Sequence, residues 1–379
     1  MAASVLSAPM ASIGVPKEIK LDEKRVALTP DAVRELVSQG LEVLIEAGAG
    51  AGAGIGDDAF AAAGARLVNR DEAWGAHLVV KVKEPQAEEF AFLRQDMVLF
   101  TYLHLAAYPG VGEALLEAGT TAIAYETVQL ENGSLPLLAP MSEIAGRLAG
   151  QVGAHLLEKP HGGRGVLMGG CTGVQPARVV VLGAGTVGWN AARIAAAMDA
   201  EVLLLDRSPQ RLRSLEADRR GRLMSVVSSR GLLERLVPTA DLVIGAVLTP
   251  GGRAPTLVDE GMVQQMRPGS VIVDVAIDQG GCIATSQETT HRDPTVTIHG
   301  VQHYAVGNMP GAVPFTSTEA LVSVTLPYIL GIAGRGLEEA VTERPELISG
   351  LNTVQGSVCH PGVAKALGVP PRHPMACLR

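Results

Sequence analysis

The segment from Val179 to Asp206 constrains the fold of this chain more than any other part of the sequence. A run of Val and Leu leads into the spacing Gly-x-Gly-x-x-Gly, at Gly183, Gly185 and Gly188. A helical stretch of Ala, Ile and Met follows, and a second apolar run ends at Asp206. A strand, a glycine turn, a helix and a strand ending in an acid form the dinucleotide-binding unit of doubly wound α/β proteins. The sequence therefore predicts a Rossmann-like parallel sheet.

Each residue type in this segment has a separate task in dinucleotide binding. The first glycine permits a tight turn, the second lets the backbone approach the pyrophosphate, and the third lets the helix contact the strand. Asp206 would accept hydrogen bonds from the adenosine ribose and repel a 2′-phosphate, so we expect NAD rather than NADP. Arg207 and Arg211 are ordinarily solvated charges, although either could hold a phosphate. We keep Arg211 as a candidate cofactor contact.

Composition and charge narrow the class of protein. The chain has 379 residues and is 47% hydrophobic, which predicts two domains rather than one core. Its net charge of −8 disfavours nucleic acid and anionic membrane surfaces as partners. We find no apolar run of membrane-spanning length, no basic leader and no metal-like cysteine spacing. We therefore expect a cytoplasmic α/β enzyme with no membrane partner.

Short apolar runs alternate with helical patterns through the first third of the chain. Thr29 is the predicted N-cap of a helix with Pro30 at its first position and Gly40 at its end. Such alternation predicts parallel strands joined by helices. We expect strands at 13–15, 41–46, 78–82, 97–101 and 121–125, and further helices near 57–63, 86–94 and 110–118.

A long helix separates this region from a second alternating series. Apolar residues recur at every fourth position within residues 140–158, which predicts a helix with one apolar stripe. The tail from about Ser317 is expected to be helical again. Further strands are expected at 179–182, 201–205, 224–227, 242–245 and 271–274.

A second glycine-rich segment, residues 47–54, also fits part of the dinucleotide pattern. Its alternating Ala and Gly continue to Gly56 before a helix can begin. No strand ending in an acid follows at the required distance. We interpret this segment as a turn rather than a nucleotide site.

Two positions in the first region could provide substrate chemistry. A small acid needs a cationic side chain for its carboxylate, and carbonyl chemistry needs a proton donor or acceptor. Arg25 stands in a charged loop, where an exposed arginine is the ordinary interpretation. His104 follows a predicted strand and is the histidine best placed for acid–base work, with a structural histidine as the alternative.

Two lysines interrupt the apolar strand near residue 80. Lys81 and Lys83 stand where alternating burial would place valine, at the carboxyl end of a parallel strand. Both would share one face if the strand continued. Periodicity alone therefore does not distinguish them as substrate contacts.

Two acids stand at the end of the last strand predicted for the second domain. Asp274 and Asp278 flank this end, and we place Asp278 toward the nicotinamide side of a bound cofactor. His299 and His303 have the spacing of a helical metal pair, but strand and loop are predicted there and a third ligand is not evident. We expect no metal.

Taken in order, the motifs of the chain resemble those of the alanine dehydrogenase family. The motifs are GVPKE, RVALTP, KVKEP, LHLA, AYETVQ, LLAPMSE, GGRGVLMGG, VLGAGTVG, IGAVLTPG, VDVAIDQGGC and NMPGAVPFTST. The resemblance extends over nearly the whole chain. It implies reversible, NAD-linked oxidative deamination of L-alanine to pyruvate and ammonium.

The same resemblance implies roles for the matched positions. Arg25 would clamp the substrate carboxylate, and Lys83 rather than Lys81 would contact the carbonyl or carboxylate. His104 would be the general acid and base, and Asp278 would assist at the amine and nicotinamide side. The implied cofactor contacts are Ser142, Gly183, Gly185, Gly188, Asp206, Ser228, Asn308 and Met309.

The resemblance also implies a fold and an assembly. We expect two Rossmann-like doubly wound domains joined by long helices, with homohexamers as the common assembly. The substrate domain would be discontinuous, comprising 1–136 and 315–379, and the NAD-binding domain would comprise 137–314. The residues before Ile13 extend beyond the family pattern and are expected to be disordered, and Trp189 is a bulky departure on the cofactor helix.

Two alternative functions are a related enzyme component and a different class of protein. The nucleotide-binding component of a proton-translocating transhydrogenase shares the early RVALTP-like motif, but resembles this chain less at KVKEP, LHLA and AIDQGG. A non-catalytic NAD-binding sensor would be favoured if Lys83, His104 or Asp278 were replaced, and all three are present. The physiological direction and the use of glyoxylate or 2-oxobutyrate remain open at this point.

Overall fold

The computed structural model describes residues 6, 8–218, 221–247 and 254–378, which divide into two compact units. Unit 1 is Met1–Pro140 with Val313–Arg379, and unit 2 is Met141–Ala312. The domain bounds proposed from the sequence lie within a few residues of these limits. The chain therefore leaves unit 1 once and returns to it after unit 2.

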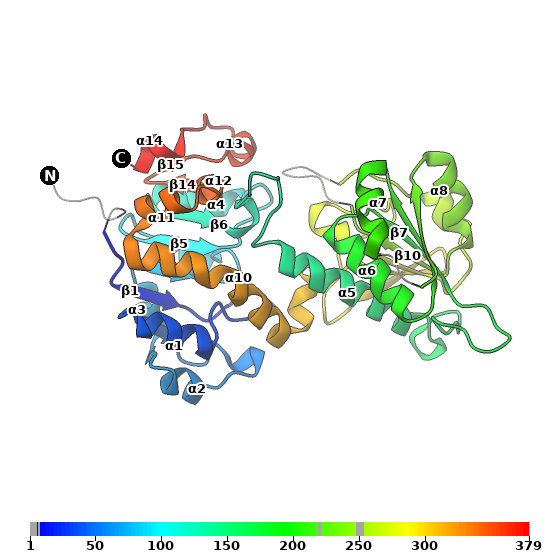
Figure 1. The fold of residues 1–379 in the computed structure, drawn as a ribbon, viewed down its shortest axis with the longest axis horizontal. Helices are drawn as coiled ribbons and strands as arrows, with labels where there is room; N and C mark the ends of the chain where they lie inside the picture. The colour runs from blue at the N-terminus through cyan, green and yellow to red at the C-terminus, as the bar shows by residue number, and fades with distance from the viewer. Residues whose placement is uncertain (1–5, 7, 219–220, 248–253, 379) are drawn as a thin grey trace. The chain divides into compact units, whose positions relative to one another are not determined.

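The sheet of unit 1 has eight strands. They are β1 Ser12–Val15, β2 Glu42–Glu46, β3 Arg66–Val68, β4 Leu78–Val80, β5 Val98–Thr101, β6 Thr121–Ala124, β14 Leu351–Val354 and β15 Ser357–Val358. Their spatial order is β15-β14-β6-β5-β4-β1-β2-β3. The first six strands of the chain pair in parallel, whereas β14 and β15 are antiparallel additions at one edge (Figure 1). The parallel strands follow the doubly wound order 3-2-1-4-5-6.

The helices of unit 1 cover this sheet. They are α1 Pro30–Ser38, α2 Asp57–Ala62, α3 Arg70–Trp74, α4 Pro109–Glu117, α10 Pro314–Arg335, α11 Leu337–Glu343, α12 Leu347–Gly350, α13 Pro361–Leu367 and α14 Pro374–Leu378. The predicted start of α1 is confirmed, since the Thr29 side chain accepts a hydrogen bond from the Ala32 amide at 3.3 Å. The helix expected near 86–94 is a 3-10 turn, Ala87–Phe92, and its buried Glu89 side chain accepts a hydrogen bond from Lys81 Nζ at 3.0 Å.

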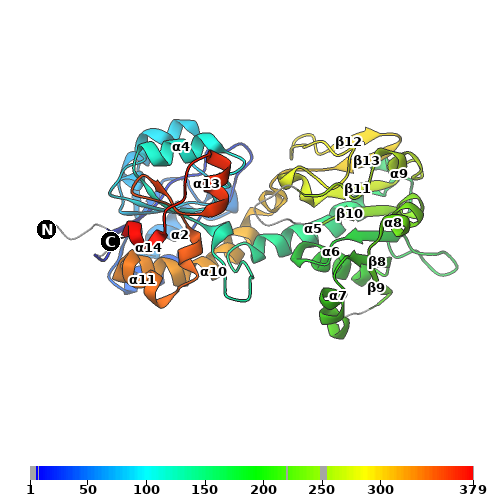
Figure 2. The same ribbon diagram turned by 90° about the horizontal axis from the view of Figure 1, so that it is seen from above.

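Unit 2 contains a second sheet with the same winding. Its strands are β7 Arg178–Leu182, β8 Glu201–Asp206, β9 Leu223–Val227, β10 Leu242–Gly245, β11 Val271–Asp274, β12 Thr295–Ile298 and β13 Val301–Tyr304. Their order is β12-β13-β11-β10-β7-β8-β9, and among the described strands of this sheet only β12 runs antiparallel (Figure 2). The prediction of two Rossmann-like doubly wound sheets is confirmed, with antiparallel strands at the edges.

Close helix packing in unit 2 depends on glycines. Its helices are α5 Ala139–Leu156, α6 Thr186–Ala197, α7 Pro209–Leu215, α8 Arg230–Leu236 and α9 Glu260–Gln264. A Cβ atom added to Gly146 would lie 2.2 Å from the Val187 carbonyl oxygen, and one on Gly153 would lie 2.4 Å from Leu242. The small residues of α5 therefore let it approach α6 and β10 closely (Figure 1).

Both ends of the chain differ from the sequence-based expectation. The expectation of disorder before the first strand is wrong for Leu6 and Met10, which are buried. The Leu6 carbonyl accepts a hydrogen bond from the Leu337 amide at 2.9 Å, and the Met10 amide donates to Ala333 at 2.8 Å. The tail is also not wholly helical, because β14 and β15 extend the sheet. Pairing with a distant strand edge leaves little local signal in the sequence.

One described helix, α10, is long and apolar enough to cross a membrane by length and composition. No apolar segment of this length was expected from the sequence. Its Leu321, Ile329 and Ile332 side chains are buried within unit 1. A core helix buried among other helices passes the same test.

Candidate functional site

The carboxyl edge of the sheet in unit 1 gathers the candidate substrate residues. Arg25 lies in the loop after β1, Lys83 follows β4, His104 follows β5 and Glu126 follows β6. The strand order reverses between β1 and β4. Ligands of doubly wound sheets bind beyond the strand carboxyl ends at such a reversal. The topology therefore brings together three cationic or basic side chains that are far apart in the sequence.

Arg25 is a buried residue, and the ordinary interpretation of an exposed arginine is wrong. Its side chain is 2% exposed, with Nε 2.7 Å and Nη2 2.6 Å from the two carboxylate oxygens of Glu23. Burial alone would raise the pKa of Glu23, but the Arg25 charge and its hydrogen bonds outweigh burial and lower this pKa to about 2. The bidentate pair fixes the plane of the guanidinium group.

The structure separates the two lysines that periodicity left equivalent. Lys81 is fully buried, and its Nζ lies 3.0 Å from both Glu18 and Glu89. Lys83 is 9% exposed, and its charge lowers the pKa values of Glu23 and His104. Lys81 thus forms buried ion pairs with two carboxylates. Lys83 is close enough to Glu23 and His104 for its charge to affect both side chains.

His104 has an unusual backbone and a specific ring environment. Its φ of 49° is in the left-handed region, which few non-glycine residues adopt. The amide of His104 donates to Glu126 Oε1 at 2.6 Å, and the imidazole stacks on Tyr102 with a centroid distance of 5.8 Å. Strained backbone held by hydrogen bonds is a common property of functional sites.

The protonation state of His104 follows from its surroundings. Burial first, and then the positive charges of Lys83, Lys20 and Arg25, lower the pKa of His104 to about 3. The side chain nevertheless keeps 36% of its surface exposed, so solvent and a small ligand can reach the ring. His104 is therefore a neutral imidazole near pH 7 in the free protein.

We expect His104 to stay neutral in the free protein at pH 5, where an ordinary histidine, with a pKa near 6.5, is mostly protonated. Because the unfolded chain takes up this proton at higher pH than the folded chain, His104 lowers stability as the pH falls below 6.5. NMR of histidine-labelled protein measures the shift, with the His104 signal assigned by its loss in His104→Asn. A midpoint between pH 6 and 7 would contradict the expectation.

Two carboxylates, the half-buried Glu126 and the buried Glu18, were missed in the sequence analysis. Glu126 accepts hydrogen bonds from the amides of both Leu103 and His104. Glu18 likewise accepts from the Val82 and Lys83 amides, at 2.6 and 3.3 Å. Both residues lie inside the motifs AYETVQ and GVPKE, but bonding from a side chain to a distant backbone has no spacing signal. Each acid positions the backbone that carries a candidate catalytic or substrate-binding residue.

Replacing Glu126 by alanine is expected to lower kcat by up to about 10²-fold, because His104 loses the acceptor that positions its backbone. Glu126→Gln keeps an oxygen that can accept both amides and removes the charge. It should therefore retain most of the activity and the native NADH affinity. Steady-state kinetics and NADH fluorescence titration measure both properties. Equal losses in the two variants would show that the carboxylate charge, rather than positioning, is important.

The glycine turn of unit 2 has the geometry predicted for it. Gly183 has a φ of 99°, and a Cβ on Gly188 would lie 1.8 Å from the Gly183 carbonyl oxygen. A Cβ on Gly185 would meet only the Arg211 guanidinium, at 4.0 Å. Helix α6 begins at Thr186 directly after this open position. The space and the helix N-terminus fit a pyrophosphate.

Asp206 closes the same turn at the end of β8. Its Oδ2 accepts a hydrogen bond from the Ala184 amide, and its Oδ1 accepts from Ser208, both at 2.8 Å. Each carboxylate oxygen has a second lone pair, so both can still accept ribose hydroxyl groups. Arg211 Nη1 lies 4.0 Å from Oδ2. Arg211 therefore lies beside both Asp206 and Gly185, and is not an isolated surface charge.

The loops after β11 and β13 carry Asp278 and the predicted cofactor contacts Asn308 and Met309. Asp278 belongs to the 3-10 turn Val275–Gln279, and its Oδ1 accepts from the Asn308 amide at 3.3 Å. Asn308 has a φ of 62°, and Met309 next to it is buried. Asp274, in contrast, accepts from the Cys282 and Ile283 amides and serves to close its own loop.

Three further predicted positions lie elsewhere in unit 2. Ser142 is in the first turns of α5 and is half-buried. The Ser228 amide donates to the Asp206 carbonyl at 2.9 Å, so Ser228 lies beside the candidate ribose site. Trp189 is also half-buried on α6, and the Arg193 guanidinium lies 6.0 Å from its ring. The last four residues of the motif IGAVLTPG fall outside the described residues.

The structure shows the surroundings of the His299 and His303 pair and of the second glycine-rich segment, residues 47–54. His299 is 2.7 Å from Glu260, whereas His303 is 2.7 Å from Thr285, so these histidines have different partners. In the glycine-rich segment, a Cβ on Gly52 would lie 2.8 Å from the Lys24 carbonyl oxygen. The absence of a side chain at Gly52 therefore lets the backbone of Lys24, next to Arg25, pack against this turn.

Comparison with known proteins gives one consistent group of relatives. The alanine dehydrogenase/PNT N-terminal domain model matches residues 14–145, and the corresponding C-terminal domain model matches 149–361. The alanine dehydrogenase of Mycobacterium tuberculosis is 54% identical, over 97% of this chain and 99% of its own, and that of Bacillus subtilis is 52% identical over 94% of each.

Solved structures agree with the sequence comparison. A structure of an L-alanine dehydrogenase superposes with a TM-score of 0.91 at 51% identity, covering 94% of this chain and 99% of its own. A transhydrogenase from Sinorhizobium meliloti gives a TM-score of 0.78 at 26% identity, over 92% and 99% of the two chains. The chain is thus similar to both groups and more similar to the first.

Proposed function

The chain belongs to the alanine dehydrogenase/PNT family and is an alanine dehydrogenase, and from this premise we propose how its own residues divide the reaction. The reaction converts L-alanine, NAD⁺ and water to pyruvate, ammonium, NADH and a proton. The observation that carries the assignment is the meeting of Arg25, Lys83 and neutral His104 at one sheet edge.

The nucleotide half of the proposal assigns NAD to unit 2. The open backbone at Gly185, the left-handed turn at Gly183 and the accepting Asp206 carboxylate support this fit. When bound, NAD⁺ would accept the hydride that leaves the substrate carbon. Ser142, Ser228, Asn308 and Met309 are proposed as further contacts, on the strength of the resemblance to the family.

The substrate half assigns binding to two cations of unit 1. Arg25 pairs with the substrate carboxylate, and Glu23 holds its guanidinium in one orientation. A charged hydrogen bond of this kind contributes about 1.5–3 kcal/mol. Lys83 contacts the carboxylate or the carbonyl oxygen, where its positive charge stabilises negative charge that develops on oxygen.

The proton-transfer role belongs to His104. In the deamination direction its neutral imidazole accepts a proton from the water that adds to the iminium carbon. In the amination direction it returns a proton to the oxygen that leaves as water. The bound carboxylate of the substrate would raise the pKa of His104 by opposing the nearby cations. Asp278 assists at the amino group, a role that rests on the resemblance.

The test of this function is the oxidation of NADH by the purified chain with pyruvate and ammonium, without a partner protein. Absorbance loss that requires both substrates supports the proposal, and no loss under any condition overturns it. A transhydrogenase component would instead exchange hydride between nucleotides and need neither substrate. A panel of 2-oxo acids that includes glyoxylate and 2-oxobutyrate then defines the substrate range.

Asp206→Ala is expected to weaken NAD binding by about 10–100-fold, because the ribose loses a charged acceptor. It should also permit NADP binding, since the repelling carboxylate is gone and Arg211 lies within reach. The matched control is the double variant Asp206→Ala with Arg211→Ala, which should lose the gained NADP binding. Calorimetry with both nucleotides measures this. An unchanged preference would contradict the ribose role.

The assembly and the cellular location are proposed from the family resemblance. We expect homohexamers, which light scattering of the purified chain would detect as six chain masses. We also expect a cytoplasmic enzyme, with L-alanine, pyruvate and ammonium as its small-molecule partners.

A further inference from the structure

A group of three exposed side chains lies at the C-terminal end of α5, outside the residues assigned to the reaction. His155 is in the last turn of α5, Glu158 follows the helix, and His161 ends the short 3-10 turn Lys159–His161. Their candidate ligand atoms all lie within 4.8 Å of one another. The side chains lie near one another because a spacing of three residues places them on the same side of a helical turn.

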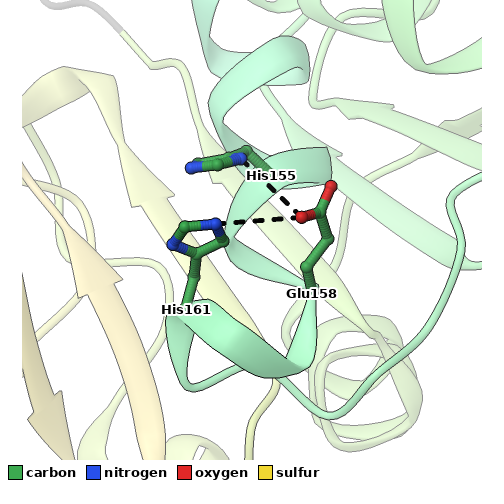
Figure 3. A group of neighbouring side chains, drawn as sticks. All are labelled: His155, Glu158 and His161. Atoms are coloured by element: carbon green, nitrogen blue, oxygen red, sulfur yellow. Dashed lines mark ion pairs between the residues drawn. The ribbon is translucent and has the colours of Figure 1, made fainter.

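The geometry of this group is specific. Nδ1 of His155 lies 4.0 Å and Nε2 of His161 lies 3.8 Å from the same oxygen, Oε2 of Glu158 (Figure 3). The two imidazole centroids are 3.7 Å apart. These nitrogen–oxygen separations exceed hydrogen-bond length, so the carboxylate oxygen lies near both imidazoles without a hydrogen bond to either.

We propose that His155, Glu158 and His161 form a surface site for a divalent transition-metal cation of the zinc class. Two imidazole nitrogens and one carboxylate are typical ligands of Zn²⁺, with bond lengths of about 2.0–2.2 Å. Tetrahedral ligands at those lengths are about 3.4 Å apart. The two nitrogen–oxygen separations therefore need to shorten by about half an ångström. The imidazoles, whose centroids are 3.7 Å apart, must also rotate so that their nitrogens point at the ion, and water completes the coordination.

The backbone favours this site by holding the three residues in place. The Glu158 amide donates to the His155 carbonyl at 3.2 Å, and the His161 amide donates to the Glu158 carbonyl at 3.1 Å. Pro160 further restricts the turn. The side chains are 56%, 56% and 39% exposed in sequence order, so small rotamer changes can close the coordination. The negative end of the α5 dipole also favours a cation there.

The test is calorimetric titration of the full chain with Zn²⁺ alone, in a Cys171→Ser background that removes an exposed thiol. We expect one saturable site per chain, weakened at least about tenfold by His155→Ala or by His161→Ala. Glu158→Gln should weaken it as well. Zn²⁺ should raise the melting temperature of the parent by more than that of the His155→Ala variant at the same Zn²⁺ concentration.

The matched control is His299→Ala, which removes another partly exposed histidine paired with a single carboxylate. Its Zn²⁺ affinity should equal that of the parent. The proposal is overturned if the parent shows no saturable Zn²⁺ binding. It is also overturned if the double variant His155→Ala with His161→Ala binds Zn²⁺ as tightly as the parent. Neither result depends on the assigned enzymatic activity, so the two proposals fail separately.

Discussion

Replacing His104 by asparagine is expected to lower kcat by about 10²–10⁴-fold while NADH still binds with native affinity. The imidazole provides the proton transfer at the substrate oxygen, and a general acid or base contributes a factor of this size. Asparagine is the sharper substitution than alanine, because residue 104 has a φ of 49° and asparagine tolerates that backbone. Steady-state kinetics with pyruvate and ammonium, and fluorescence titration with NADH, measure the two quantities.

The His104→Ala variant provides the second comparison. It removes the same imidazole but places a Cβ-bearing apolar residue in a strained conformation. Both variants should lose turnover to a similar extent if the imidazole is catalytic. Near-native turnover in His104→Asn would remove His104 from the mechanism, whereas loss only in the alanine variant would indicate that the backbone conformation is the important property.

Replacing Lys81 by methionine is expected to destabilise unit 1 by about 3–5 kcal/mol, because one partner of a buried ion cluster is removed. Glu18 and Glu89 would then remain buried without the ammonium that both contact at 3.0 Å. Burial already raises the pKa of Glu18, against the opposing effect of the Lys81 charge. Thermal unfolding at fixed protein concentration should show a fall of about 6–20 °C in the transition of this unit.

Lys83→Met is the matched control, since it makes the same substitution two positions further along the chain. It should cost less stability and reduce activity strongly, because Lys83 is proposed as a substrate contact. Adding Glu89→Gln to Lys81→Met should recover part of the lost stability by removing one buried charge. A melting temperature of Lys81→Met within about 2 °C of the parent would contradict the structural role.

Much of the nucleotide half could be predicted from local sequence. The turn at Gly183, the close contact at Gly188 and the acid at Asp206 depend on neighbouring residues and short-range geometry. The signal is strong because only glycine adopts these conformations without steric conflict. Antiparallel β14 could not be predicted in this way, because its pairing with β6 joins segments that are far apart in the chain.

The positioning acids show the limit of the sequence most clearly. Glu126 stands more than twenty residues from the His104 amide that it accepts from, and Glu18 is still further from Lys83. No periodicity relates such pairs. Their meeting follows from the parallel strand order, which brings the ends of β1, β4, β5 and β6 to one edge.

Local patterns were sufficient to predict parallel strands joined by helices, the glycine turn and the residue types available for chemistry, and the family resemblance added the doubly wound order of both sheets. Periodicity left the two lysines equivalent and the family resemblance favoured Lys83, but only the fold shows that Lys81 is held in a buried ion cluster with two carboxylates. The physical reason is that Lys81 and Lys83 have the same local pattern but different long-range partners. Two carboxylates surround Lys81, whereas Lys83 lies near Glu23 and His104.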